Sequence, residues 1–235
     1  MPWLAIRNCG HALILSDCGE DINADFLTDM VLEFAKIATR FYNAVSEFPF
    51  VYKEKQIRSV VTPALMNSAK VVFEEQPALR KAKGMKGISR RNGWIDYWVL
   101  VERMTYLVEL KYAGFSSDRN QLTDKAQNEW STAINQLSIS KKEANQLAFD
   151  GQLATVALQI MPIWQCRDAA DSITIPPKEK VQEFLTMARE QLTPQPNWSA
   201  VWYLHGRLQN SPQQYDRKFF NYPGVMFFAR LEKRA

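Results

Sequence analysis

Three ionisable residues, Asp96, Glu109 and Lys111, stand in an otherwise apolar stretch between positions 93 and 112. Two runs rich in Val, Leu, Tyr and Trp flank the polar pair Glu102-Arg103, and this pattern predicts two strands joined by a short turn. If the turn is symmetric about that pair, Asp96 lies directly opposite Glu109, with Cβ atoms roughly 5 Å apart. Glu-Arg is not a favoured two-residue hairpin turn. A four-residue loop centred on the same bond would keep the pairing, whereas an odd-length loop would shift it.

Strand side chains alternate, so we expect Glu109 and Lys111 on one face of the sheet and Val108 and Leu110 on the other. Two carboxylates and one amine would then converge on one patch. Buried charges are costly unless they are paired or bound to a metal, and a divalent cation is the simplest explanation for this set. The structural alternative is a lone ion pair at a sheet edge, in which Lys111 neutralises Glu109. That alternative leaves Asp96 unexplained.

At these residues the chain resembles the PD-(D/E)XK, or restriction-endonuclease-like, nuclease superfamily. Asp96 matches the strand aspartate of that family, and Glu109-Leu110-Lys111 matches its (D/E)XK element. Ile95 stands where the literal motif has Pro. The resemblance covers about residues 58–165. It implies an α/β fold with a restriction-endonuclease-like mixed central sheet flanked by helices, whose core runs helix, three strands, helix, fourth strand.

The resemblance also implies a chemistry. Asp96, Glu109 and the backbone carbonyl of Leu110 would hold Mg²⁺, with Mn²⁺ as a substitute and no organic cofactor. The metal would activate a bound water and neutralise the charge of a phosphate, and Lys111 would orient that water or stabilise the developing negative charge. An acidic residue from the first core helix often completes such sites. The candidates for it are, in order of preference, Glu75, Glu74 and Glu33.

The order of elements can be predicted from periodicity independently of the motif. Thr62-Pro63 is suited to open a helix, because Thr can cap and Pro is tolerated at the first helical position. For the core we predict a helix at 62–73, strands at 93–101 and 104–112, a helix at 120–138 and a buried strand at 153–164 that ends near Pro162. For the flanks we predict helices at 24–46 and 178–192, with strands within 198–206 and 224–230.

The chain is expected to form a single domain over residues 1–235. It is long enough for a full hydrophobic core, and we find no repeat, low-complexity tract or long linker. The nuclease core would occupy about 58–165. Residues 1–57 would form an N-terminal helical elaboration, and residues 166–235 a C-terminal elaboration of helix and strand.

The positive charge of the chain is unevenly distributed. The net charge is only +4, yet no acidic residue lies between Glu75 and Asp96. The cations of that segment are Arg80, Lys81, Lys83, Lys86, Arg90 and Arg91. Glycines punctuate the segment, so we expect a mobile loop that binds phosphates, which supply most nonspecific nucleic-acid affinity. The alternative is a solvated loop kept for solubility.

Two further kinds of side chain are candidates for contact with nucleic acid. Gln127, on the predicted helix 120–138, is suited to contact the backbone or the site. The aromatic residues near the motif are Trp94, Tyr97, Trp98 and Tyr112. Of these, Trp98 is the best candidate for stacking on a base, because it shares the expected face of Asp96.

Other classes of protein are poorly supported. No apolar run reaches the ~18–20 residues of a membrane span, and the first residues lack the basic start and cleavage site of a secretory signal. Three unpaired cysteines fit a cytoplasmic protein. Cys9, His11 and Cys18 suggest a zinc site, but no fourth ligand is evident. Only two histidines are present, which leaves little material for Ser-His or Cys-His catalysis.

The sequence therefore predicts a Mg²⁺-dependent endonuclease that hydrolyses phosphodiester bonds, with DNA as the expected substrate and no membrane association. One alternative is a nuclease directed at RNA, or a nickase. Another is a catalytically silent subunit that binds nucleic acid or assembles with a partner on the same fold. The motif leaves open whether the protein acts as a homodimer or with a partner subunit.

Overall fold

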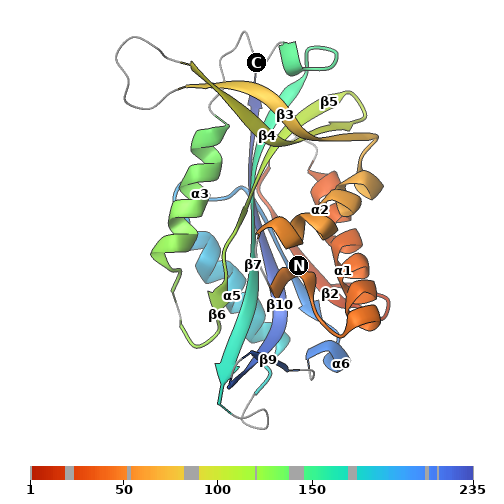
Figure 1. Ribbon diagram of the computed structural model, residues 1–235, viewed down its shortest axis with the longest axis vertical. Coiled ribbons are helices and arrows are strands. Elements are labelled where there is room, and N and C mark those ends of the chain that lie inside the picture. The colour runs from red at the N-terminus through yellow and green to blue at the C-terminus, as the bar shows by residue number, and fades with distance from the viewer. Residues whose placement is uncertain are drawn as a thin grey trace.

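A computed structural model describes residues 2–18, 24–51, 54–81, 90–119, 121–137, 146–168, 174–209, 212–215 and 217–234. Within these residues the dominant feature is one ten-stranded mixed sheet (Figure 1). Its strands are β1 (Leu4–Ile6), β2 (Gly10–Ser16), β3 (Val71–Lys81), β4 (Arg90–Val101), β5 (Met104–Tyr112), β6 (Phe115–Ser116), β7 (Leu153–Arg167), β8 (Trp198–Leu204), β9 (Gln213–Tyr215) and β10 (Lys218–Arg234). The main path has the order β1-β2-β8-β10-β7-β5-β4-β3, while β6 pairs with β7 and β9 pairs with β10. Among the described strands, β5 and β6 pair with β7 in parallel and all other pairs are antiparallel.

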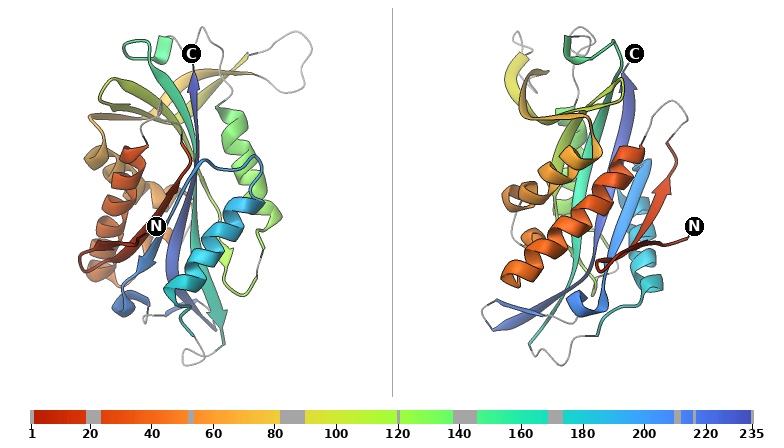
Figure 2. Two further views of the ribbon diagram at one scale, coloured as in Figure 1. Left: turned by 180° about the vertical axis from the view of Figure 1, so that it is seen from behind. Right: turned by 90° about the vertical axis from the view of Figure 1, so that its right-hand side faces the viewer.

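Helices cover both faces of this sheet. They are α1 (Asp25–Val45), the 3-10 turn η1 (Pro49–Val51), α2 (Glu54–Ser68), α3 (Asp124–Gln136), α5 (Lys178–Gln191) and the short α6 (Gly206–Gln209). Figures 1 and 2 show α1 and α2 on one face and α3 and α5 on the other. The predicted class, an α/β protein with a mixed sheet flanked by helices, is confirmed at this level.

Each face of the sheet has its own hydrophobic core. On the α1/α2 face, Phe34 packs edge-on against Trp202 of β8 and Phe227 of β10. On the α3/α5 face, Trp130 and Leu185 are fully buried. The helices form where the apolar residues recur every three to four positions, and burial of that stripe stabilises them more than their intrinsic propensity does.

The hairpin that carries the motif has the predicted register. Tyr97 pairs with Val108 and Val101 with Met104, so the turn is the two-residue Glu102-Arg103. The disfavoured turn sequence is accommodated because Glu102, the first residue of the turn, adopts a left-handed backbone with φ of 53°, and both favoured types of two-residue hairpin turn need a positive φ at that position.

The helix predicted at 62–73 is wrong in its bounds. The helix α2 begins at Glu54, and Pro63 lies inside it rather than at its start. Pro63 removes one helical hydrogen bond, but burial of Val60 and Leu65 holds the helix together. From Val71 the chain is the strand β3, because this apolar run pairs with β4.

The strand predicted to end near Pro162 continues to Arg167. Ile160 is the last β7 residue that pairs with β5, and Ile163 is the first that pairs with β6. On the β5/β6 side of β7, Pro162 therefore falls between these two partners, and on the other side it pairs in register with Val225 of β10.

The flanking segments extend the same sheet. Strand β2 pairs with β8, and the C-terminal strand β10 lies between β8 and β7. The N-terminal elaboration is thus not only helical as predicted, since it contributes β1 and β2. The other flanking helices and strands agree with prediction to within a few residues at most ends, except that β10 is much longer than the strand expected there.

Candidate active site

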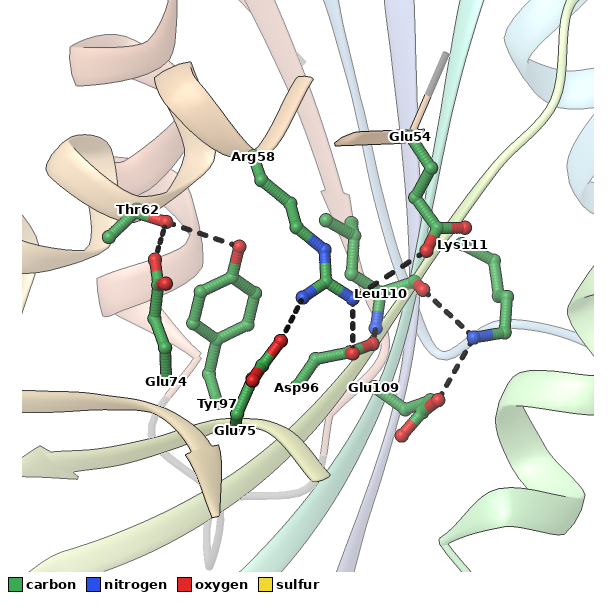
Figure 3. Close-up of polar contacts among 10 residues, drawn as sticks. All are labelled: Glu54, Arg58, Thr62, Glu74, Glu75, Asp96, Tyr97, Glu109, Leu110 and Lys111. Carbon is green, nitrogen blue, oxygen red and sulfur yellow. Dashed lines mark hydrogen bonds and ion pairs between the residues drawn. The ribbon is translucent and has the colours of Figure 1, made fainter. Parts of the chain in front are cut away.

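The candidate site lies where β4 and β5 separate (Figure 3). Their described ladder ends at the pair Tyr97 and Val108. At the next position of β4, a side chain rather than the backbone contacts β5: Asp96 Oδ2 accepts a hydrogen bond of 2.8 Å from the backbone N–H of Leu110. Asp96 is only 8% exposed. The Asp96 side chain thus links β4 to β5 beyond the end of the backbone ladder. This contact fixes the position of Asp96.

Glu109 and Lys111 form an ion pair on β5. The Lys111 Nζ donates to Glu109 Oε1 at 2.9 Å and to the carbonyl oxygen of Leu110 at 3.1 Å. Glu109 is 2% exposed and Lys111 is 8% exposed. The predicted alternation of faces holds here, since Val108 and Leu110 pack into the α1/α2 core. Leu110 therefore joins the two halves of the site, with its N–H on Asp96 and its carbonyl on Lys111.

Two of the site residues that sequence reasoning missed lie on the first turns of α2. Arg58 contacts Asp96 Oδ1 through Nη2, and the same nitrogen lies 3.6 Å from Glu54 Oε1. Glu54 and Arg58 are four residues apart, so they share a face of the helix. The signal was available, because Ile57, Val60 and Val61 continue the apolar stripe of α2 upstream of Thr62.

The predicted third acid, Glu75, is not on a helix. It lies on β3 with a left-handed backbone, its side chain is 69% exposed, and its carboxylate is 3.9 Å from Arg58 Nη1. Glu74 accepts a hydrogen bond from Thr62, and Glu33, on α1, accepts hydrogen bonds from Lys36 and Asn67. The acidic residue of the first core helix that lies near Asp96 is Glu54.

The electrostatics of the site are set by burial and by crowded carboxylates. Burial raises the pKa of Glu54; the neighbouring Asp96 raises it further, while Lys111 lowers it. Burial also raises the pKa of Tyr97 to about 12, so its hydroxyl, 3.3 Å from Thr62 Oγ1, stays protonated. In the described part of the chain, no three acidic, His or Cys side chains form a group able to hold a metal ion.

A buried glutamine adjoins Lys111. Gln159 pairs in register with Lys111 across the parallel strands β5 and β7. Its Nε2 donates to the carbonyl of Ala126 at 3.0 Å, and its Oε1 is buried without a hydrogen-bond partner. Sequence reasoning missed Gln159, since a lone polar residue within a predicted strand carries no motif.

The described ends of the basic segment are paired strands, since the backbone pairs Arg80 with Arg91 and Lys81 with Arg90. The rest of the predicted loop, residues 82–89, lies outside the described residues, and with it the predicted phosphate contacts Lys83 and Lys86. In Figure 1 the paired ends of β3 and β4 lie above α3.

The remaining candidates have structural partners. Gln127 exchanges hydrogen bonds with the backbone of Thr193, at 2.7 Å and 3.1 Å, so its amide ties α3 to the segment after α5. Trp98 donates to the carbonyl of Leu147 and packs on Phe73, which argues against a stacking role. Among the four aromatic candidates, Trp94 is the exposed one, at 59%. Cys9 and Cys18 each direct Sγ to a different backbone carbonyl, which gives the zinc alternative no support.

Comparisons with protein-family models, with curated proteins and with solved structures found no match. No helix among the described residues has the length and apolar character needed to cross a membrane. A function for this chain therefore has to follow from its own residues and their geometry.

Proposed function

We propose that this protein is a metal-dependent endonuclease that hydrolyses phosphodiester bonds in DNA. The observation that carries the proposal is that the backbone of Leu110 contacts both parts of the site. Its N–H donates to Asp96, and its carbonyl accepts from Lys111, which is also paired with Glu109. The order α2, then β3 to β5, then α3, then β7 supports a restriction-endonuclease-like core, since it is the helix, three strands, helix and fourth strand that the family implies.

The donor set suits a hard divalent cation. Asp96, Glu109 and the Leu110 carbonyl supply only oxygen ligands, and Mg²⁺ is usually bound by one or two carboxylates together with waters. Glu54 is the nearest further acid. When bound, the metal would polarise a phosphate oxygen and lower the pKa of a coordinated water. Each carboxylate already has a cationic partner, Arg58 for Asp96 and Lys111 for Glu109. The surroundings of both carboxylates therefore favour a positive charge.

The protein's own groups account for the rest of the chemistry. The hydrogen bond from the Leu110 N–H keeps Asp96 in place. Lys111 has three N–H donors, two of which are directed at Glu109 and Leu110. The third is suited to orient an attacking water or to stabilise negative charge on the phosphate. Low exposure of all three side chains strengthens these interactions, because the local dielectric is below that of water.

The cationic residues at the ends of β3 and β4, Arg80, Lys81, Arg90 and Arg91, suit a polyanionic substrate, and DNA is the one that we propose. A nuclease directed at RNA, or a nickase, would use the same residues. The catalytically silent alternative is disfavoured because three buried ionisable groups are retained at one site, and burial of such groups is costly. The three cysteines, Cys9, Cys18 and Cys166, are all free thiols, which suits a cytoplasmic location.

Asp96→Asn tests the proposal. Asparagine keeps an oxygen acceptor for the Leu110 N–H but removes the charge, so we expect plasmid cleavage in Mg²⁺ or Mn²⁺ to fall by at least a factor of about 10². Asp118→Asn is the matched control, because Asp118 pairs with Arg167 at 2.8 Å elsewhere on the surface. Cleavage by Asp96→Asn at the wild-type rate, or a wild type inactive on duplex DNA, single-stranded DNA and RNA, would overturn the proposal.

A further inference from the structure

Arg58 is the residue of the site whose surroundings are least explained by a purely structural role. Its guanidinium lies among three carboxylates (Figure 3): Asp96 in direct contact, Glu54 at 3.6 Å and Glu75 at 3.9 Å. Arg58 alone is in ion-pair contact with these three acidic side chains, while the ammonium of Lys111 also acts on Glu54 and lowers its pKa. Such an excess of negative charge favours a further cation at this position.

The contact between Arg58 and Asp96 has a geometry that suits replacement of Arg58 by another cation. Strong arginine–carboxylate pairs are bidentate, with two parallel N–H···O bonds. Here only Nη2 meets Asp96, because the second carboxylate oxygen is taken by the Leu110 N–H. The same Nη2 is shared with Glu54, and Nη1 is directed at the exposed Glu75.

Arg58 also has a route out of the site. Its side chain is 24% exposed, whereas that of Asp96 is 11% exposed. The Arg58 side chain is therefore more accessible to solvent than the carboxylate that it neutralises. It can turn outward on a flexible stem while Asp96 stays fixed by the backbone of β5.

We propose that Arg58 is an exchangeable cation of this site: it neutralises Asp96 when no metal is bound, and it binds a phosphate of the nucleic acid once a metal takes the Asp96 carboxylate. The inference rests on the proposed nuclease function. It adds to that function a residue that binds the substrate and that, in the free protein, competes with the metal for Asp96. A guanidinium suits this exchange, because its planar fork fits carboxylate and phosphate equally well.

Arg58→Met and Arg58→Lys separate this role from a structural one. Calorimetric titration with Mn²⁺ should show roughly tenfold tighter binding to Arg58→Met, since a like charge next to the ligand is gone. Arg58→Lys, which keeps the charge, should bind Mn²⁺ as the wild type does. In Ca²⁺, used to hold DNA without cleavage, Arg58→Met should weaken duplex binding and lower the salt slope by about one, the value expected when one phosphate is no longer neutralised.

Arg189→Met is the matched control, because Arg189, on α5 across the sheet from α2, pairs with Asp17 and not with a residue of the site. It should change neither Mn²⁺ affinity nor salt slope. A static tie between α2 and β4 predicts a different result, a lower melting temperature with unchanged metal affinity and unchanged slope. That result would overturn the inference while the nuclease proposal stands.

A second variant keeps the inference testable if Arg58→Met does not fold. Arg58→Gln removes the charge but retains a polar group that can still donate to Asp96. It should also bind Mn²⁺ more tightly and show the lower salt slope, and if both quantities stay at the wild-type values the inference is overturned. A wild type that binds no Mn²⁺ overturns both proposals.

Discussion

Lys111 is the residue on which chemistry and stability can be told apart. An ammonium group donates hydrogen bonds and has no lone pair for a metal, and Lys111 directs its Nζ at Glu109 and the Leu110 carbonyl. In Lys111→Met, metal affinity should be unchanged or higher, while the cleavage rate should fall by factors of ~10²–10³. Mn²⁺ calorimetry and a plasmid assay on the same preparations measure the two effects.

The control for this variant is Lys180→Met, which breaks the exposed pair with Glu183. If Lys111 and Glu109 were only an ion pair, Lys111→Met would lose stability because the buried Glu109 loses the ammonium of Lys111, and Mn²⁺ would not restore the lost stability. Under the nuclease proposal, Mn²⁺ raises the melting temperature of the variant, since ligand binding to the folded state stabilises it.

At the residue scale, much of the site could be predicted from local patterns. The alternation within β5 and the symmetry of the Glu102-Arg103 turn were enough to bring Asp96 beside the Glu109 strand, because strand geometry has a period of two and a turn fixes register. Arg58 and Glu54 were not found. Their place depends on how α2 packs across the sheet, which no local pattern encodes.

At the scale of elements, the β3–β4 hairpin is expected to set affinity rather than chemistry. Its backbone brings Arg80 opposite Arg91 and Lys81 opposite Arg90, so four cationic residues of the sequence meet at one end of the strand pair. Such a group suits the phosphates of a polyanion. Changing all four to Gln should weaken duplex binding in Ca²⁺ and reduce the salt slope by roughly one for each phosphate that is no longer neutralised.

The control for the hairpin is Lys178→Gln with Lys180→Gln on α5, on the opposite side of the sheet from α1 and α2. Titrations at several salt concentrations decide. A slope that stays the same in the hairpin variant would mean that the hairpin is merely solvated. The single-turnover cleavage rate at saturating DNA should stay within about threefold of wild type, because the changed positions lie at the ends of β3 and β4 that are away from the pairing of β4 with β5.

Element bounds were predicted well where one periodicity held throughout. The helix α3 and the strand β7 lie close to their predicted ranges, since their apolar stripes are continuous. The error at 62–73 arose because Pro63 was taken as a start signal, whereas tertiary packing of Val60 and Leu65 carries the helix through it. Backbone propensity was outweighed there by burial.

At the scale of the whole molecule, the flanking segments belong to the core. Strand β10 pairs with β7 along almost its full length, from Phe219 with Arg167 to Arg234 with Leu153. The predicted nuclease core at 58–165 does not include β10, so on its own it would lack the strand that pairs with β7. Sequence periodicity could not reveal this, because antiparallel pairing of segments far apart in the chain leaves no local signal.

The isolated segment 58–165 should consequently fail to fold. It would expose the edge of β7, and it would also lose the packing of Phe34 and Phe227, which close the α1/α2 core. Circular dichroism and a thermal melt should show no cooperative transition for the segment, in contrast to a single transition for residues 1–235. A native-like spectrum with a cooperative melt would instead mean that the family-sized core is an independent domain. In that case the N- and C-terminal strands would be additions to the sheet. The site formed by Asp96, Glu109 and the Leu110 carbonyl should then keep its metal affinity without them.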